Sequence, residues 1–514
     1  MTTKLSSGNH GVIVVHGVGE QKKGEQIAEF GDQLAEALIN SFQEEFGEEC
    51  ERPVRLDMNI DSDPESVILH IETPTGEKAD WVCKEAYWAD AFLAPSARDV
   101  LGWGFTKNVP VLWWAFLRIL KCYGIVLVDP LNNAYTAEMY EAAKPQLPFS
   151  RSKRSSSERA PRTPPSTPLS PVKPKSADVL TPKLPWWAAL FGRLVVWPMH
   201  LVSCFLSIFL AIVALPALFI YWVISHVPFT IKPLEDLVEW MRANTDPFFS
   251  KSIGDMTQYV ENAAWSASMR NRLEKVIIEM LNDERLKDVT IVAHSMGGIL
   301  TYETLSKNGN VAKEVNRLKN QAKAKKITFV SVGSGVNIAF VIANQKGCST
   351  EGKNRIRQPL AVEITGPSPN MFCWIDIYAR LDPVPAGYLS DEVIDVINEN
   401  TLSREQVERR KVANKDDLFL DHFGYWRNHE TVMPRIAKAI NGGEYPWERE
   451  DKANKTPGIT AKKLTRNFMD VMSWTGWKLF FIVLLVVFRG MLWRGLVEVW
   501  ELVAAFWKWL AALL

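Results

Sequence analysis

One serine lies where nucleophilic chemistry would need it. Ser295 is part of the run V-T-I-V-A-H-S-M-G-G-I-L, which predicts a strand that ends just before the serine and a helix that begins just after it. A turn this sharp needs small residues on both sides, and Ala293 and Gly297 meet that need. The N-terminus of the helix would favour negative charge that develops beside Ser295. The run therefore predicts a serine nucleophile, the alternative being a glycine-containing turn with a capping serine.

A second motif, H-G-V-G, covers His16 to Gly19 near the start of the chain. It follows the apolar run Gly11–Val15 and precedes a polar, helix-favouring stretch that reaches about Phe46. This order predicts a strand, a loop and a helix, which is the opening unit of an α/β fold. On its own the motif is equally compatible with an ordinary turn after a strand.

The two motifs together resemble those of the α/β-hydrolase lipases and esterases. A-H-S-M-G-G resembles their nucleophile elbow, including a bacterial lipase subgroup in which Ala replaces the first Gly of G-x-S-x-G, and H-G-V-G resembles their oxyanion loop. The resemblance covers about residues 1–95 and 255–440. It implies that the backbone N–H groups of Val18 and Met296 hold the oxyanion. It also implies a role in shaping the loop and the elbow for His16, Gly17, Gly19, His294, Gly297 and Gly298.

A serine nucleophile needs a base that takes its proton. The chain order of the resembling family is Ser, then Asp or Glu, then His, and two histidines follow Ser295, namely His422 and His429. His422 lies in D-H-F-G-Y-W, which resembles the His-x-x-Tyr-Trp ending of several lipase-like families, and a final helix is predicted at about Glu430–Ile440. We therefore assign the base to His422 and interpret His429 as a helix-start or surface histidine.

The base in turn needs an acid that orients it, and Asp382 is the first candidate. It follows the predicted strand Phe372–Ala379 in R-L-D-P-V-P, where Pro383 fixes the loop. An Asp-Pro-Val sequence after a strand resembles the acid loop of lipase-like hydrolases. Asp376 lies inside the strand pattern and Asp391 lies farther along the loop, so both are weaker candidates.

Apolar, β-branched runs separated by helix-length segments predict the sheet that positions these residues. The predicted fold class is α/β, an α/β-hydrolase-like, mostly parallel sheet flanked by helices, with inserted apolar membrane helices and a disordered linker. Its catalytic domain comprises residues 1–100 and 232–445. The strand-like runs after the first are Val54–Ile60, Val67–Glu72, Trp81–Trp88, Val289–Ala293, Ile327–Val332 and Phe372–Ala379.

Two further features carry no predicted chemistry. Gly333 and Gly335, in F-V-S-V-G-S-G-V, resemble the strand end that shapes the pocket floor of lipases. The run E-A-Y-W-A-D around Trp88 is interpreted as packing.

Four segments lie outside the predicted catalytic domain. Residues 101–149 predict an apolar insertion, in which 109–128 is as compatible with an interfacial or re-entrant helix as with a membrane crossing. Residues 150–183, rich in Ser, Pro and basic residues, predict a disordered linker. Residues 184–231 predict a membrane-embedded segment or hairpin, because they contain a long apolar run with no acid or base except His200. Residues 446–514 predict a C-terminal tail with apolar and amphipathic membrane-associated helices.

The strands before and after the insertion are predicted to belong to one sheet, and this restricts how often the chain between them can cross a membrane. Strands on both sides of the insertion must lie on the same side of the bilayer, so the chain between them crosses an even number of times. A hairpin within 186–228, one crossing each by 109–128 and 194–225, and embedding from one face all satisfy this condition. Eight Lys and Arg against two acids between residues 151 and 183 favour a cytoplasmic linker. We therefore expect a membrane protein with a cytoplasmic catalytic domain.

Composition excludes several classes of function. The charges balance, with 59 Lys plus Arg against 59 Asp plus Glu, so no overall field recruits nucleic acid. Six cysteines without a C-x-x-C pair predict free thiols in a reducing compartment. The N-terminal apolar run is too short for a cleavable signal peptide. No nucleotide-binding or metal-ligand pattern stands out, so we expect no cofactor and no metal.

Together these features predict a membrane-associated serine hydrolase that cleaves acyl esters through an acyl-enzyme, with Ser295, Asp382 and His422 as its triad. Since an enzyme at a bilayer meets phospholipids and acylglycerols, a lipase or phospholipase is the first expectation. Protein deacylation or thioester hydrolysis is the alternative within the same chemistry. The alternative from another class is a non-catalytic membrane-remodelling or tethering protein on a hydrolase-like fold.

Overall fold

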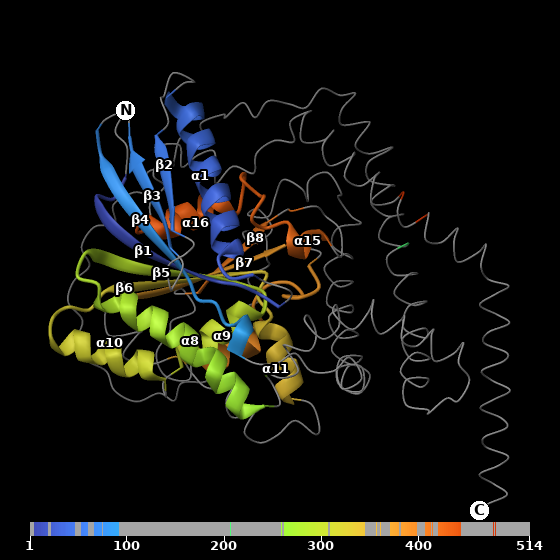
Figure 1. Ribbon diagram of the computed structural model, residues 1–514. Coiled ribbons are helices and arrows are strands. Elements are labelled where there is room, and N and C mark those ends of the chain that lie inside the picture. Colours follow the sequence, from blue (N-terminus) through green and yellow to red (C-terminus); the bar gives the residue numbers. More distant parts are fainter. Residues whose placement is uncertain are drawn as a thin grey trace, which may run out of the picture.

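The computed structural model describes most of residues 5–91 and much of residues 262–443, two stretches far apart in sequence that share one sheet (Figure 1). No helix in these described stretches is both long and apolar enough to cross a bilayer. The apolar insertion, the linker, the membrane-embedded segment and the C-terminal tail predicted from the sequence lie outside them, apart from isolated residues. The described residues are 5–18, 22–46, 53–59, 66–73, 76–91, 262–306, 309–344, 371–379, 382–397, 407–412 and 420–443, with the single residues 206, 259, 356, 360, 414, 476 and 479.

Eight described strands form one sheet in the order β2-β3-β4-β1-β5-β6-β7-β8. The pairs β2–β3 and β3–β4 are antiparallel, and all other neighbours are parallel. Because β1 lies between β4 and β5, the N-terminal part of the chain and the part after residue 262 build the same sheet. The strands are β1 (Gly8–Val15), β2 (Val54–Asn59), β3 (Ser66–Glu72), β4 (Lys78–Glu85), β5 (Leu286–His294), β6 (Lys326–Val332), β7 (Phe372–Ala379) and β8 (Val407–Val412).

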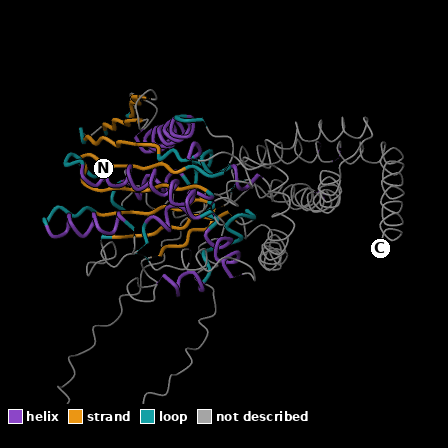
Figure 2. The backbone as a smooth tube through the Cα atoms, turned by 60° about the horizontal axis from the view of Figure 1, so that its bottom comes forward, coloured by secondary structure: helices purple, strands orange, loops and turns teal. Residues whose placement is uncertain are grey.

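Helices cover both faces of the sheet (Figure 1 and Figure 2). One face carries α1 (Glu25–Phe46) and α16 (Met433–Ile440), and the other carries α8 (Ala263–Asn282), α9 (Met296–Thr304), α10 (Asn310–Asn320) and α11 (Val336–Asn344). The short elements are η1 (Ala89–Ala91), α14 (Asp391–Ile397) and α15 (Leu420–Phe423).

The side chains of β1 alternate between two apolar cores. Val12 and Val14 lie in the core beneath α1 and α16, whereas Ile13 and Val15 lie in the core beneath α8 and α9. Burial on both faces explains why the central parallel strands are continuous apolar runs rather than alternating ones.

The predicted mostly parallel sheet flanked by helices is confirmed, with local differences. β4 occupies Lys78–Glu85, three residues earlier than predicted. The final helix begins at Met433 rather than near Glu430, and Pro434 lies in its first turn, where a missing N–H costs nothing. β8 was not predicted, because its sequence V-E-R-R-K-V is polar and four of its six residues are only half-buried at the edge of the sheet.

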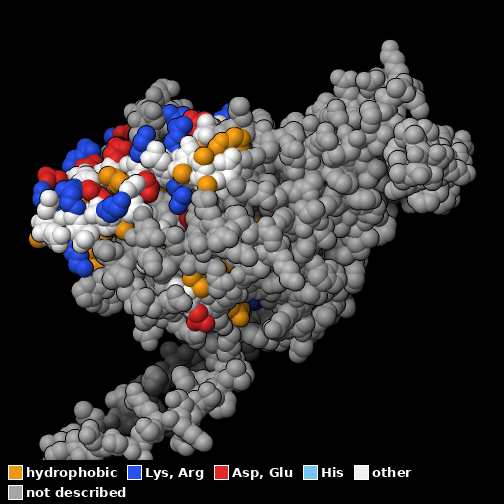
Figure 3. Space-filling model, turned by 90° about the horizontal axis from the view of Figure 1, so that it is seen from below, with side chains coloured by type: hydrophobic (Ala, Val, Ile, Leu, Met, Phe, Trp, Pro, Cys, Tyr) orange, Lys and Arg blue, Asp and Glu red, His pale blue; other side chains and the backbone are white. Residues whose placement is uncertain are grey.

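Charged side chains of both signs are intermixed on the surface of the described residues that Figure 3 shows. Close ion pairs account for part of this pattern. Arg317 Nη2 lies 2.6 Å from Glu314 Oε1, and Lys323 Nζ lies 2.7 Å from Glu284 Oε1. The mixture agrees with the balanced composition of the chain.

Candidate active site

Ser295 forms the sharp turn between β5 and α9. Its backbone has φ 56° and ψ −123°, a left-handed value of φ that few residues other than glycine adopt. Such a conformation costs about 1–3 kcal/mol and persists only where the surroundings enforce it. Here the Ser295 N–H donates to Val332 O at 3.1 Å, while the Ser295 carbonyl accepts from the N–H groups of Gly298 and Gly335 at 3.1 and 3.2 Å. These bonds hold the strained turn, in which the Ser295 side chain faces His422.

The glycines of both motifs are required by close approach of the chain. A Cβ on Gly297 would lie 2.6 Å from His16 O, and one on Gly298 would lie 2.2 Å from a serine Oγ in the turn after β6. A Cβ on Gly17 would lie 2.6 Å from Ser295 Cβ. The loop after β1 thus runs directly against the Ser295 turn, with no room for side chains at these positions.

Three buried side chains form a line of hydrogen bonds across the carboxyl ends of the strands. His422 Nε2 lies 3.0 Å from Ser295 Oγ. His422 Nδ1 lies 2.9 Å from Asp382 Oδ2 and 3.0 Å from Oδ1. His422 belongs to α15, and Asp382 follows β7. In this arrangement Nδ1–H donates to the carboxylate, which leaves Nε2 to accept the serine proton.

Asp382 has two further donors that hold its carboxylate in place. The Tyr425 hydroxyl donates to Oδ2 at 2.7 Å, and the Val384 N–H donates to Oδ1 at 2.9 Å. Burial, followed by the charge of Asp382, raises the pKa of Tyr425 well above its usual value, so the phenol stays a neutral donor. Gly333, at φ +56°, makes room, because its Cβ would lie 2.6 Å from the Tyr425 ring. Sequence analysis assigned no role to Tyr425, although this residue lies in the His-x-x-Tyr-Trp pattern, and no chemistry to Gly333.

The weaker candidates from the sequence lie elsewhere. His429 Nε2 lies 2.8 Å from Gln33 Oε1, on the α1 side of the sheet. Asp376 accepts from Ser331 Oγ at 2.7 Å within the sheet. Asp391 is the first residue of α14, and its side chain is outside the described set. Of the candidates for base and acid, the structure thus brings His422 and Asp382 to the serine.

His16 fixes the loop that follows β1. Its Nδ1–H donates to Gly17 O at 2.8 Å, and its Nε2 accepts from the Trp88 N–H at 3.3 Å. The Trp88 indole N–H donates back to His16 O at 3.1 Å, and the two rings stack at 4.5 Å. Burial lowers the pKa of His16 to about 4, so the ring is neutral. Val18 follows this anchored Gly17 and is described, whereas Gly19 lies outside the described residues.

His294 and Met296 flank the nucleophile. The His294 Nε2–H donates to the backbone oxygen of His422 at 3.1 Å, and the two imidazole rings stack with centroids 4.7 Å apart. Burial, then the neighbouring His422, lowers the pKa of His294 to about 3, so it too is neutral. The hydrogen bond and the ring stacking of His294 therefore help to hold His422 in position. Met296 is the first residue of α9, so the N-terminus of that helix lies next to Ser295.

Comparison with known proteins covers this region. Residues 249–342 match a family model described as "Alpha/beta hydrolase of unknown function (DUF900)". The match includes α8, β5, Ser295, α9, α10, β6 and most of α11. This match and the mostly parallel sheet both support a fold of the α/β-hydrolase type. No curated protein matches the chain, and the description of the matching family leaves its reaction open.

Other reactive groups of the described residues lie apart from the serine. Within the described ranges, no group of three or more His, Cys, Asp or Glu could hold a metal ion. Two cysteines, Cys83 and Cys373, are described as free thiols, and burial raises the pKa of each. At the site itself, the described groups are a hydroxyl, an imidazole and a carboxylate in line, which can transfer a proton and form a covalent bond to an electrophile.

Proposed function

We propose that this protein is a membrane-associated serine esterase of the α/β-hydrolase superfamily, of the lipase or phospholipase class, with Ser295 as its nucleophile. The observation that carries the proposal is the hydrogen-bonded line from Ser295 Oγ through His422 to Asp382, with heavy-atom distances of 3.0 and 2.9 Å. These distances suit a hydroxyl that loses its proton to an imidazole whose other N–H is fixed by a carboxylate.

Acylation begins when Ser295 Oγ attacks the ester carbonyl carbon while His422 Nε2 takes the hydroxyl proton. Asp382 keeps the other ring proton on Nδ1 and stabilises the imidazolium that forms. The tetrahedral intermediate collapses when the C–O bond to the alcohol breaks and His422 gives its proton to the departing oxygen. In the second half of the reaction, His422 takes a proton from water while the water oxygen attacks the acyl carbonyl carbon. The C–O bond to Ser295 then breaks, His422 returns the proton to Ser295 Oγ, and the carboxylic acid is released.

The oxyanion of the intermediate is held by the backbone N–H groups of Val18 and Met296 in this proposal. Met296 begins α9, where N–H groups lack partners within the helix. Val18 directly follows Gly17, whose Cα packs against the Ser295 side chain, so the loop passes the reacting atom. Removal of one such donor costs about 10²–10³ in turnover in serine hydrolases.

A lipid substrate is supported by two features. Residues 184–231 and 446–514 both contain apolar runs that include several Trp residues, and these runs would hold a cytoplasmic catalytic domain at the bilayer. Phe423, directly after His422, is 75% exposed, with its ring 5.5 Å from the imidazole. An exposed aromatic ring beside the base offers an apolar contact to an acyl chain. Protein deacylation would use the same chemistry and the same contact.

The strain at Ser295 argues against a purely structural role. A protein that only tethers or reshapes membranes on this fold would gain nothing from a residue held at φ 56°. Relaxation of this backbone conformation would stabilise such a protein, so the conformation favours a function that needs the Ser295 hydroxyl held beside His422.

A fluorophosphonate probe tests the proposal, because it reacts covalently with an activated serine. Full-length protein in detergent should be labelled, and Ser295→Ala should not. His422→Ala should lose labelling, whereas the matched control His429→Ala should keep it. Absence of labelling in the wild-type protein, or equal labelling of Ser295→Ala, would overturn the proposal. Turnover of a short-chain ester, a triacylglycerol, phospholipid vesicles and an S-acylated peptide then assigns the substrate class.

A further inference from the structure

Asn337 lies in the first turn of α11, and its side-chain amide binds a single loop of the protein. The residue is buried, with 3% of its surface exposed. The amide Nδ2 donates to Pro385 O at 2.7 Å and to Tyr388 O at 3.0 Å, and Oδ1 accepts from the Ser390 N–H at 2.9 Å. All three bonds reach the loop that connects β7 and α14. Three bonds from one buried side chain hold this loop at a fixed distance from α11.

The part of the loop that Asn337 binds has a strained backbone. Ala386 has φ 50° and Gly387 has φ 94°, and alanine seldom adopts a positive φ. The two carbonyls that accept from Asn337 flank this pair, since they belong to Pro385 and Tyr388. A strained turn persists only where its surroundings enforce it. The Asn337 amide bridges the two ends of the turn and so helps to enforce its conformation.

The same loop carries the acid of the candidate triad. Asp382 lies three residues before Pro385, and its Oδ1 accepts from the Val384 N–H at 2.9 Å. Its Oδ2 lies 2.9 Å from His422 Nδ1. Val384 directly precedes Pro385, whose carbonyl binds Asn337. A shift of the strained turn would therefore move the carboxylate relative to the imidazole.

The chain that leads into Asn337 contacts the nucleophile. Gly335, two residues earlier, donates its N–H to Ser295 O at 3.2 Å. Gly333 lies against the acid, because a Cβ on this glycine would be 3.0 Å from Asp382 Oδ2. The segment between β6 and α11 thus contacts both the Ser295 turn and the acid, and Asn337 joins this segment to the acid loop by hydrogen bonds.

We propose, building on the proposed esterase function, that Asn337 is a positioning residue that holds the acid loop so that the Asp382 carboxylate faces His422 Nδ1. Asn337 acts through the carboxylate and not on the substrate, so its loss should lower kcat and leave KM nearly unchanged. A misplacement of about 1 Å caused by a remote mutation can cost about 10²-fold in rate. Asn337→Ala should therefore lower kcat by about 10²-fold.

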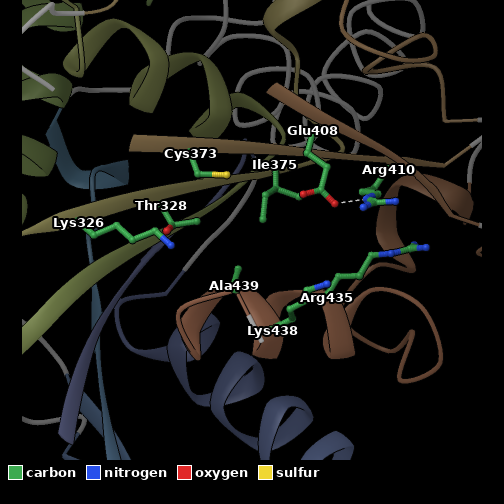
Figure 4. Close-up of a pocket in the computed structure, with 10 residues that line it drawn as sticks. Lys326, Thr328, Cys373, Ile375, Glu408, Arg410, Arg435, Lys438 and Ala439 are labelled. Atoms are coloured by element: carbon green, nitrogen blue, oxygen red, sulfur yellow. Dashed lines mark hydrogen bonds and ion pairs between the residues drawn. The ribbon is translucent and has the colours of Figure 1, made fainter. Parts of the chain in front are cut away.

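A matched control lies at the opposite end of the sheet. Asn441 is also a buried asparagine, 2% exposed, and its Oδ1 accepts from a backbone N–H far away in the chain, that of Ser6, at 2.8 Å. In sequence it lies between Ala439 and Gly443, which line a pocket of about 200 Å³ together with Lys326, the first residue of β6 (Figure 4). Asn441→Ala removes a buried amide but does not touch the acid loop, so it should lower stability and keep kcat within about twofold of wild type.

The test measures kcat and KM on a soluble ester, the rate of fluorophosphonate labelling and the urea midpoint for full-length wild type, Asn337→Ala and Asn441→Ala. Circular dichroism checks folding. If Asn337→Ala does not fold, Asn337→Ser replaces it, because serine keeps one hydroxyl donor and should show the same effect on kcat with a smaller loss. The labelling rate is also measured in the Asp382→Asn background. There the further loss caused by Asn337→Ala should stay within about twofold, because the carboxylate that Asn337 positions is already gone.

Four results would overturn the inference. They are a wild-type kcat in folded Asn337→Ala, a loss confined to KM, equal losses in the wild-type and Asp382→Asn backgrounds, and an equal loss of kcat in Asn441→Ala, which would show that lost stability alone explains the effect. If wild type is labelled and Ser295→Ala is not, the proposed function stands and such a result concerns Asn337 alone. If wild type is not labelled, the proposed function fails and the role of Asn337 fails with it.

Discussion

Two buried His–Asp pairs lie at opposite ends of the same sheet. His422 Nδ1 lies 2.9 Å from Asp382 Oδ2, beyond the last residues of the strands. His10 Nδ1 lies 2.7 Å from Asp288 Oδ1, near the first residues of β1 and β5. In residue type, in the ring nitrogen used and in distance, the pairs are nearly the same.

The pairs differ at the second ring nitrogen. His422 Nε2 faces Ser295 Oγ at 3.0 Å, a hydroxyl that can give up a proton. His10 Nε2 faces the backbone oxygen of Ser6 at 3.1 Å, which can only accept. The second pair therefore ties the N-terminus to the start of β5, while the first can take a proton. A catalytic pair is thus recognised by its third partner and by its place at the carboxyl ends of the strands.

The largest expected effect separates the two histidines. His422→Ala and Ser295→Ala should each lower kcat/KM on a soluble ester by about 10⁴-fold or more, because either change removes the proton transfer. His10→Gln should leave kcat/KM within about twofold, since it lies far from the reacting hydroxyl. Ester hydrolysis by proteins whose folding is checked by circular dichroism decides the matter. A folded His10→Gln protein without activity would contradict the comparison.

The two aspartates should divide in the same way. Asp382→Asn should lower kcat by about 10⁴-fold, because an amide favours the wrong tautomer of His422, with little change in the denaturation midpoint. Asp288→Asn should instead reduce the free energy of unfolding by about 1–3 kcal/mol and leave turnover nearly unchanged. Urea unfolding and steady-state kinetics measure both quantities for each variant. Equal losses of activity in the two variants would mean that position in the sheet does not distinguish the pairs.

Much of the fold and part of the site could be predicted from the sequence, because the residues concerned follow strands with local patterns. Ser295 and Asp382 each lie within three residues of the end of an apolar run that predicts a strand. Tyr425 and Trp88 could not be assigned, because their partners lie 43 and 72 positions away in the chain. Only the folded sheet brings these pairs together.

A third histidine extends the comparison to pH. Burial holds the pKa of His16 at about 4, against 6.5 for an ordinary histidine, so the unfolded chain binds one more proton between these values. The stability from neutral His16 is present above pH 6.5 and falls by about 3 kcal/mol as the pH drops toward 4. His16→Gln removes this titration, so the destabilisation that it causes should shrink between pH 7 and pH 4.5. Urea unfolding at both pH values tests this, and an unchanged destabilisation would contradict it.

The smallest expected effect concerns Tyr425, which positions the Asp382 carboxylate. Among the described contacts of the His10–Asp288 pair, no tyrosine has this role. Tyr425→Phe removes the donor 2.7 Å from Asp382 Oδ2 and the acceptor of the Ala379 N–H. The carboxylate then has fewer constraints, so kcat should fall about tenfold. Steady-state kinetics and urea unfolding measure activity and stability of the variant. Lost stability with an unchanged kcat would show that Tyr425 only packs against Gly333.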